Sequence, residues 1–352
     1  MPWFSSRAAW SRELRDHRTM TEPSFPTYAE LLARTDAPPG SAWGVWGADD
    51  EIGTLNHLTP ERVRDAASLV RSGQRIRLDH PLEAFDPPPA PTRKPLRHMM
   101  FGVNDHHRDE YLDGFYTQGS SQLDGLRHFA HPEHGFYNGV DPGRLLPGQP
   151  TLGVNRYAEH GIVGRGVLVD VDAHLRSQGH LIDHDGGEAI DVATVLAAAA
   201  AQGVELRAGD ILLVRTGWGH HYLNALGPRE RRELVPLRAS GLRACVETIE
   251  WLWDSRFAVV ASDTFAVEAW PAPQDSPFLT AAERTGAPLS PHSGLMHRVL
   301  IPLLGVVLGE LWALDELAAA CAADGRWDCM VVATPLNLTG GVGSPSNAVA
   351  IR

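Results

Sequence analysis

The stretch GDILLVRTGW, residues 209–218, decides the fold class of this chain. Its centre, Ile211–Arg215, is an uninterrupted run of large aliphatic residues that ends in one arginine. Turn residues bound the run, with Gly209 and Asp210 before it and Gly217 after it. A short aliphatic run between turn signals is typical of a strand that is buried on both faces. Such strands occur mainly where helices cover a sheet, so the stretch predicts an α/β protein.

Similar runs recur on both sides of this strand, and helical patterns separate them. We predict further strands over residues 75–80, 166–172, 257–262 and 330–335. Helices are predicted over residues 60–71, after the N-cap residue Thr59, and over 191–201, 237–253 and 314–323. The alternation supports the α/β assignment. Because no repeat or linker divides the chain, we expect one domain over residues 26–352 and a mobile N-terminal extension over residues 1–25.

Composition and charge exclude several classes of function. The chain has 352 residues, of which 43% are hydrophobic and 21% charged, as in ordinary globular proteins. Its formal net charge of -12 argues against a nucleic-acid partner, since phosphate binding needs a basic surface. No apolar run is long enough for a membrane span. The three cysteines have no CxxC spacing, which favours a reducing, cytoplasmic location over a disulfide framework or a zinc knuckle. We expect a small-molecule substrate.

The residues most suited to chemistry lie in DGFYTQGSSQLDGLRHFAHPEHGFYNGV, residues 113–140. Asp124 and His128 are four residues apart, so their side chains can converge if the segment turns. Together they could bind a metal, or act as a general base with its orienting acid. A histidine-rich, solvated loop explains the same composition without any site.

Three further positions are candidates. Glu310 is the only charged residue in the apolar stretch 299–314, and a buried carboxylate needs a cation, a metal or hydrogen bonds. It could meet His297 at a shared site, or it could cap a helix. Asp263 ends a predicted strand, where it could cap, orient a histidine or hold a substrate. The glycine-rich stretch 340–345 could form a tight turn or contact an anion. The chain lacks the GxSxG and HExxH motifs, which disfavours an ordinary serine hydrolase or zincin.

These segments resemble the cyclase-type hydrolases, a family that includes bacterial kynurenine formamidases and isatin hydrolases and that carries the pattern HxGTHxDxPxH. On this chain the pattern falls on residues 118–128: Asp124 and His128 match, whereas Gln118 and Gln122 replace its first two histidines and Leu126 its proline. The resemblance extends to WGADDEIGTLNHLTPE at 46–61, GDILLVRTGW at 209–218, MHRVLIPLLGVVLGELWALDELA at 296–318 and PLNLTGGVGSPSNAVAI at 335–351.

The resemblance implies a fold, a site and an assembly. The fold would be the swivelling β/β/α cyclase-like type, with a mixed, curved central sheet in a single catalytic domain. A zinc or manganese ion would be held by Asp124, His297 and Glu310, with Gln122 as a further ligand. His128 would be the general base or a second-site ligand. Because the glutamines make the ligand set harder and richer in oxygen, they would favour manganese or magnesium, or abolish metal binding. Family members are homodimers or homotetramers, and we expect the same here.

Three functions remain open from the sequence. The first is hydrolysis of a C–N or C–O bond in a small cyclic amide, lactone or acylated amine by a metal-activated water. The second is metal-independent acid–base chemistry by Asp124 and His128, in a cyclase, dehydratase or isomerase. The third is a non-catalytic binding protein. In the first two, the candidates for substrate binding are the polar Gln118 and Asp263 and the aromatic residues Trp43, Trp46, Phe115, Tyr137 and Trp218.

Overall fold

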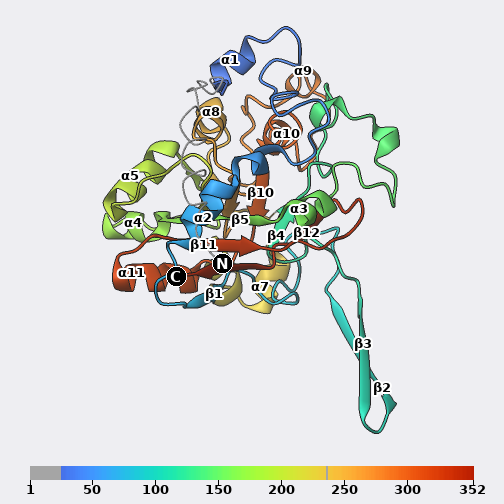
Figure 1. Cartoon of the computed structure of the whole chain (residues 1–352), viewed down its shortest axis with the longest axis vertical. Coiled ribbons are helices and arrows are strands. Elements are labelled where there is room, and N and C mark those ends of the chain that lie inside the picture. The colour runs from blue at the N-terminus through green and yellow to red at the C-terminus, as the bar shows by residue number, and fades with distance from the viewer. Residues whose placement is uncertain (1–24, 235–236) are drawn as a thin grey trace, which may run out of the picture.

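A mixed nine-stranded sheet forms the centre of the protein, as seen in a computed structural model that describes residues 25–234 and 237–352 (Figure 1). The strand order is β1-β13-β11-β5-β7-β9-β10-β4-β12. The neighbours β5, β7, β9 and β10 run parallel, and the other pairs are antiparallel. The bounds are β1 Arg75–Arg77, β4 Gln122–Asp124, β5 Ile162–Asp170, β7 Ile211–Arg215, β9 Val259–Ser262, β10 Val307–Glu310, β11 Asp328–Ala333, β12 Gly343–Pro345 and β13 Ala348–Ile351.

Helices cover this sheet and connect its strands. The helix α2 packs on β5 and β11, and α5 packs on β5 and on α4. The α-helices are α1 Tyr28–Leu32, α2 Pro60–Ala67, α3 Val154–His160, α4 Val171–Ser177, α5 Val192–Gln202, α6 Trp218–His220, α7 Pro228–Glu233, α8 Val246–Asp254, α9 Ala281–Arg284, α10 His297–Leu300 and α11 Asp315–Asp324. Short helical turns lie at η1 Gly53–His57, η2 Tyr137–Gly139, η3 Pro142–Arg144 and η4 His221–Ala225.

The strand that decided the fold class lies where the sequence predicted it. The strand β7 spans Ile211–Arg215, and its four aliphatic residues are buried between the parallel neighbours β5 and β9. The preceding strand ends earlier than predicted, because the Asp170 side chain accepts a hydrogen bond from the backbone of Ala173 and so caps α4. The mixed α/β architecture predicted from the sequence is confirmed.

The predicted helix over residues 237–253 is wrong in its first half. The helix α8 begins only at Val246, and the residues before it are extended. Ala239 pairs with Trp270 through backbone hydrogen bonds, and β8, Gly241–Leu242, pairs with β6, Ala189–Ile190. A side chain at Gly241 would meet the backbone of Glu268 at 2.5 Å. Pairing with distant backbone therefore overrides the local helical pattern.

A hairpin that the sequence did not predict projects from the body of the protein (Figure 1). Its strands are β2, Arg97–Asn104, and β3, His107–Asp113, and all of their residues are exposed. They form a separate two-stranded sheet. We call residues 97–113 the arm.

The sequence also predicted an N-terminal extension and no membrane span. Apart from Phe25, the expected N-terminal extension lies outside the described residues. Phe25 itself packs against Trp46 and Trp253, with ring centroids 5.7 and 5.1 Å away. Within residues 25–234 and 237–352, none of the helices has the length and apolar character needed to cross a membrane.

Candidate metal centre and pocket

Two antiparallel strands bring the candidate acids together. Gln122 and Asp124 are separated by one residue in β4, so their side chains point to the same face of the sheet. Glu310, the last residue of β10, lies directly opposite Gln122. Cross-strand partners share a face, so Glu310 points to the same side as the two residues of β4. All three residues are buried.

His297 completes this group from the start of α10. Its Nε2 lies 3.1 Å from Oε1 of Glu310 and 3.6 Å from Oδ2 of Asp124. One ligand atom from each of Asp124, His297 and Glu310 lies within 4.8 Å of the others. The structure thus joins three of the residues predicted to hold a metal. We call these three residues the acid–histidine centre.

Glu268, which the sequence did not single out, holds His297 from the other side. Its Oε1 lies 2.6 Å from Nδ1 of His297 and accepts a hydrogen bond from the His297 backbone at 3.1 Å. Its Oε2 accepts a hydrogen bond from the backbone of Met296 at 2.6 Å. Because the Glu268 carboxylate accepts a hydrogen bond, it favours a proton on Nδ1, and Nε2 is the ring nitrogen left to face Asp124 and Glu310.

The charges around His297 are strongly coupled. Desolvation by burial opposes protonation, but the nearby carboxylates of Asp124, Glu268 and Glu310 outweigh it and raise the pKa of His297 well above its usual value. Burial likewise acts to raise the pKa of Asp124, yet His128, His297 and Gln118 lower it overall. Three carboxylates thus converge on one imidazole in a buried site. Such a site needs positive charge, either the proton on His297 or a bound cation.

The two glutamines of the motif donate hydrogen bonds to the acids. Nε2 of Gln118 donates to Oδ1 of Asp124, and Nε2 of Gln122 donates to Oε2 of Glu310, each at 2.6 Å. Gly343 of β12 makes room for the first of these, because a Cβ there would lie 2.5 Å from Cγ of Gln118. The oxygen of Gln122 faces Arg93, whose Nη1 is 3.5 Å away. The glutamine amides therefore act as hydrogen-bond donors to the carboxylates.

One carboxylate oxygen of the centre has no hydrogen-bond partner. Oδ2 of Asp124 is buried and accepts no hydrogen bond from the residues described. Buried carboxylate oxygens are normally paired, and this one lies 3.6 Å from Nε2 of His297, which in turn lies 3.1 Å from Oε1 of Glu310. Two carboxylates and an imidazole whose Nε2 faces both of them are a suitable donor set for a divalent cation. The residues present therefore fit a metal ion.

A pocket opens beside this centre. His128 follows Asp124 through a tight turn closed by a hydrogen bond from the His128 backbone to Gly125. Its Nε2 lies 4.0 Å from Oδ1 of Asp124, and a quarter of its side chain is exposed. The walls of the pocket combine ionisable and apolar residues, namely Arg93, Gln122, His128, Phe129, Phe265, Ala266, Trp270, His292, Leu295, His297 and Glu310.

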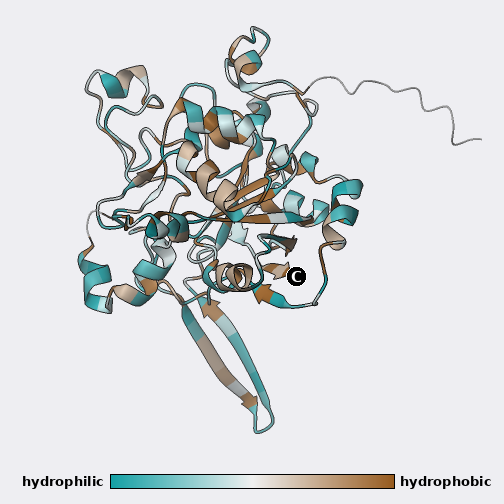
Figure 2. Ribbon diagram, turned by 90° about the vertical axis from the view of Figure 1, so that its left-hand side faces the viewer, coloured by the Kyte–Doolittle hydropathy of each residue, from teal (hydrophilic) through white to brown (hydrophobic). Residues whose placement is uncertain are grey.

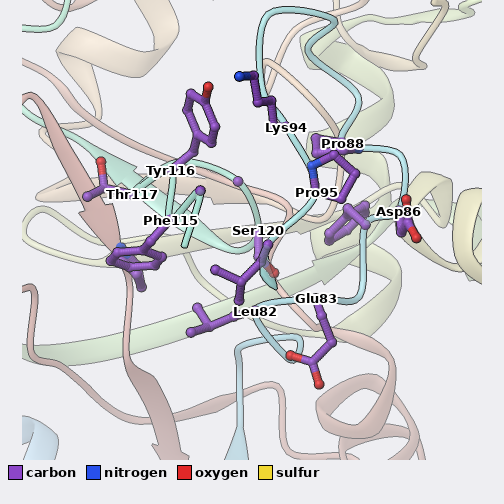
Figure 3. A pocket seen from close by; sticks show the side chains of 15 residues that line it. Leu82, Glu83, Asp86, Pro88, Lys94, Pro95, Phe115, Tyr116, Thr117 and Ser120 are labelled. Carbon is purple, nitrogen blue, oxygen red and sulfur yellow. The ribbon is translucent and has the colours of Figure 1, made fainter. Parts of the chain in front are cut away.

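The structure does not bring the other predicted substrate-binding residues to this pocket. Gln118 is buried behind Asp124. Asp263 accepts hydrogen bonds from Thr216 and Gly217. The aromatic residues have other partners: Trp43 donates a hydrogen bond to the carbonyl of Pro302, Tyr137 donates one to Asp50, Trp46 packs on Phe25 and Trp218 stacks on Tyr222. Phe115 lines a different pocket at the base of the arm, together with Leu82 and Lys94 (Figure 3).

The pocket walls contain residues that sequence reasoning passed over. Glu268 had a usable signal, because it is the only acid in the apolar run 265–270, the same signal that drew attention to Glu310. Arg93, Phe129, Trp270 and His292 had none. They reach the pocket from segments that are far apart in the chain.

Comparisons with known proteins agree with this architecture. The family model Cyclase, described as "Putative cyclase", matches residues 76–269. The solved structure of a protein described as a novel cyclase is 32% identical, with a TM-score of 0.75, over 89% of this chain and 99% of that chain. Isatin hydrolase A from Ralstonia solanacearum is 19% identical, with a TM-score of 0.51, over 79% of this chain and 91% of its own. No curated protein gives a significant match. The predicted curved, mixed sheet is thus shared with solved structures of this fold.

Proposed function

Because the chain belongs to the cyclase family, we propose that it is an enzyme that hydrolyses a small cyclic amide, lactone or acylated amine at a metal centre. The observation that carries this proposal is the unpaired Oδ2 of Asp124 beside His297 and Glu310. We infer that these three residues are the metal ligands. Manganese or zinc is the expected ion.

A divalent cation in this position supplies Lewis acidity, which lowers the pKa of water and polarises a carbonyl. The residues of this chain have separate tasks around it. Asp124 and Glu310 provide negative charge, and Glu268 keeps the proton on Nδ1 of His297 so that Nε2 is free to ligate. Gln118 and Gln122 fix the carboxylates by donating to the oxygens that face them.

His128 is the residue placed to move a proton. It lines the pocket, is partly exposed and lies next to Asp124. In this proposal it takes a proton from water and returns it to the leaving nitrogen or oxygen. Phe129, Phe265 and Trp270 form flat apolar walls, which suit a planar substrate.

One observation favours a second function. The hydrogen bonds from Gln118 to Asp124 and from Gln122 to Glu310 satisfy carboxylate oxygens without any metal. In that case His297 keeps its second proton, and Asp124 and His128 act as an acid–base pair in a cyclase, dehydratase or isomerase.

Metal content distinguishes the metal-dependent hydrolase from the metal-independent acid–base enzyme. It is measured by mass spectrometry on protein purified without a histidine tag or chelator. The metal centre predicts about one ion per chain in the wild type and loss of that ion in His297→Ala and Glu310→Ala. Glu316→Ala, an exposed acid on α11, is the matched control and retains the ion. A wild type that takes up no manganese, zinc or magnesium would sink the metal mechanism.

Activity against cyclic amides, lactones and formamides is then measured on the loaded protein. Hydrolysis that is lost in His128→Ala, with metal content retained, supports the proposed role of His128. A metal-free protein that converts a small metabolite only when Asp124 and His128 are intact supports the second function. Unchanged ligand affinity in Asp124→Ala and in His128→Ala, with no turnover by the wild type, would indicate a binding protein.

A further inference from the structure

Arg93 is a cationic residue of the pocket that has no acidic partner. It lies in the segment that leads into β2, the strand with which the arm leaves the body of the protein (Figure 2). Its Nη1 donates a hydrogen bond to the backbone carbonyl of Gln118 and lies 3.5 Å from Oε1 of Gln122. In the part of the chain that the structure describes, no carboxylate forms an ion pair with its guanidinium group. Because a guanidinium stays protonated, Arg93 brings a permanent positive charge into the pocket.

A second arginine beside the site has the opposite surroundings. Arg298 directly follows His297, and its guanidinium pairs with both oxygens of Glu283, at 2.7 and 3.0 Å. The charge of Arg298 is therefore compensated within the protein. Two neutral oxygens hold Arg93 instead, and its Nε and Nη2 atoms make no hydrogen bond within the described residues and are not fully buried. The guanidinium of Arg93 is thus fixed in position while its charge and donors remain available to a ligand.

Flat rings form the wall of the pocket beside this charge. The ring of His292 packs edge to face against Phe129 and Trp270, with ring centroids 5.4 and 5.7 Å away. Burial, together with the positive charges of nearby histidines and arginines, lowers the pKa of His292 and so favours a neutral ring. A guanidinium next to flat, uncharged rings suits a planar organic anion, since the rings take up the plane and the N–H groups bind a carboxylate.

The contacts of Gln122 place this charge close to the acid–histidine centre. The amide oxygen of Gln122 faces Arg93 at 3.5 Å, and the amide nitrogen donates to Oε2 of Glu310 at 2.6 Å. One amide group therefore separates Arg93 from a proposed metal ligand. His297 and Glu310 line the same pocket as Arg93. A ligand whose carboxylate contacts Arg93 consequently has its next few atoms beside the acid–histidine centre.

We propose that Arg93 binds a carboxylate carried by the substrate, and that the substrate is a planar acid whose hydrolysable amide or lactone lies within a few bonds of that carboxylate. The assignment of the substrate class rests on the proposed function, whereas the binding of a carboxylate by Arg93 does not. Hydrolysis of an amide or lactone also creates a carboxylate. The experiment therefore has to distinguish the carboxylate of the substrate from that of the product.

Isothermal titration of the full chain, with the metal it holds after purification, tests the proposal with three probes. Benzoate carries a carboxylate, benzamide carries an amide on the same ring, and 2-carbamoylbenzoate carries both on adjacent carbons. The wild type is expected to bind 2-carbamoylbenzoate most tightly. In Arg93→Gln, the affinity for both carboxylates should fall by about 10-fold or more, because a charge-assisted hydrogen bond is lost. The affinity for benzamide should change by less than about twofold, since benzamide carries no charge.

Two further variants serve as controls. Arg71→Gln removes an exposed arginine outside the pocket and should bind all three probes like the wild type. Arg93→Lys keeps the charge but not the paired donors, so its affinity for benzoate should lie between those of the wild type and Arg93→Gln. Metal content and circular dichroism are measured for each variant. Both should match the wild type, because the residues of the acid–histidine centre keep their contacts with one another.

Three results would overturn the proposal. Benzoate that does not bind the wild type, or that binds Arg93→Gln equally well, would show that Arg93 holds no carboxylate. Equal weakening of benzoate and benzamide would show that Arg93 only positions the two glutamines. If 2-carbamoylbenzoate binds no more tightly than benzoate, Arg93 serves the product alone. A wild type without metal that still binds benzoate through Arg93 would contradict the proposed function only, whereas a metal-loaded protein without this dependence would contradict the role of Arg93 only.

Discussion

Two buried aspartates at strand ends of the central sheet, Asp263 and Asp124, differ in the hydrogen bonds that their carboxylate oxygens accept. Asp263 directly follows β9 and is 3% exposed, and Asp124 ends β4 and is 1% exposed. Oδ1 of Asp263 accepts hydrogen bonds from the backbone and hydroxyl of Thr216, and Oδ2 accepts one from the backbone of Gly217. In Asp124, Oδ1 accepts one from Gln118, and Oδ2 accepts none.

Under the proposed function, the difference separates a structural acid from a metal ligand. The donors to Asp263 belong to the turn that leads from β7 into α6, so this carboxylate ties two strand ends together. Burial raises the pKa of Asp263 to about 6, against the effects of Arg215 and of these hydrogen bonds. Asp124 instead faces two histidines and has an oxygen left over. Residue type, burial and position at a strand end are the same in both, so only the partners distinguish them.

The largest effect is expected for Asp124→Asn, which removes the charge but keeps the shape. Metal affinity should fall by more than the roughly 100-fold that loss of an outer-shell partner can cost, because a ligand itself is lost. Isothermal titration with manganese or zinc measures this change. The variant should remain folded, since Glu268 and Glu310 still pair with His297. Unchanged affinity would mean that the unpaired oxygen is not a ligand.

The matched substitution Asp263→Asn should have the opposite profile. Its amide N–H groups would face backbone donors at Thr216 or Gly217, which leaves buried groups unpaired. We expect a loss of about 2 kcal/mol in the free energy of unfolding, measured by urea denaturation. Metal affinity should stay at the wild-type value. A stable variant with weakened metal binding would break the comparison, because Asp263 would then belong to the site.

Glu268→Gln tests the support of His297 rather than its ligation. The amide can still accept at Nδ1 through its oxygen, but the negative charge that favours the Nδ1 proton is lost. Loss of such a partner typically weakens metal binding by about 10- to 100-fold. The test adds a readout that a purely structural role would not change, the number of protons released on metal binding as a function of pH. Weaker binding with unchanged proton release would contradict the role in fixing the tautomer.

How well each part of the fold could be predicted from sequence depends on how far apart its interacting residues lie along the chain. The strand Ile211–Arg215 was predicted without error because a local aliphatic run between turns is enough to define it. The extended conformation of residues 237–245 was not predicted, because these residues pair with the distant segments Glu188–Ile190 and Trp270. The arm was missed because its apolar residues do not alternate with polar ones, as they would in a half-buried strand.

The candidate site shows the same limit. Asp124, His297 and Glu310 were candidates because of their residue types and surroundings, the resemblance to a family joined them into one ligand set, and the structure brings them together. The predicted aromatic wall of Trp46, Phe115, Tyr137 and Trp218 rested on residue type alone, and a buried aromatic residue in a core looks the same in sequence as one in a pocket. The substrate-binding role of these four residues stays a prediction, and Phe129, Phe265 and Trp270 are the aromatic residues that line the pocket.

The smallest effect is expected for a substitution of His57. This residue sharpens the comparison because its Nε2 is also a buried atom without a hydrogen bond. Its ring lies against Phe25 and Trp46, away from the pocket. Burial, with Arg62 and Arg256 nearby, lowers the pKa of His57 from 6.5 to about 4. A neutral imidazole tolerates an unpaired nitrogen better than a carboxylate tolerates an unpaired oxygen, so the orphaned atom here need not signal a ligand.

The pH dependence of stability follows from that shift. Between pH 6.5 and about 4 the unfolded chain binds a proton at His57 that the folded chain does not, so stability is present above pH 6.5 and is lost as the pH falls toward 4. His57→Phe removes this linkage and should reduce the loss between pH 7 and pH 5 by about 1–2 kcal/mol. Urea denaturation at both pH values measures it, and metal affinity at pH 7 should not change. An unaltered acid dependence would show that His57 is protonated in the folded protein, and its free nitrogen would then have to be explained by a partner, as the free oxygen of Asp124 is.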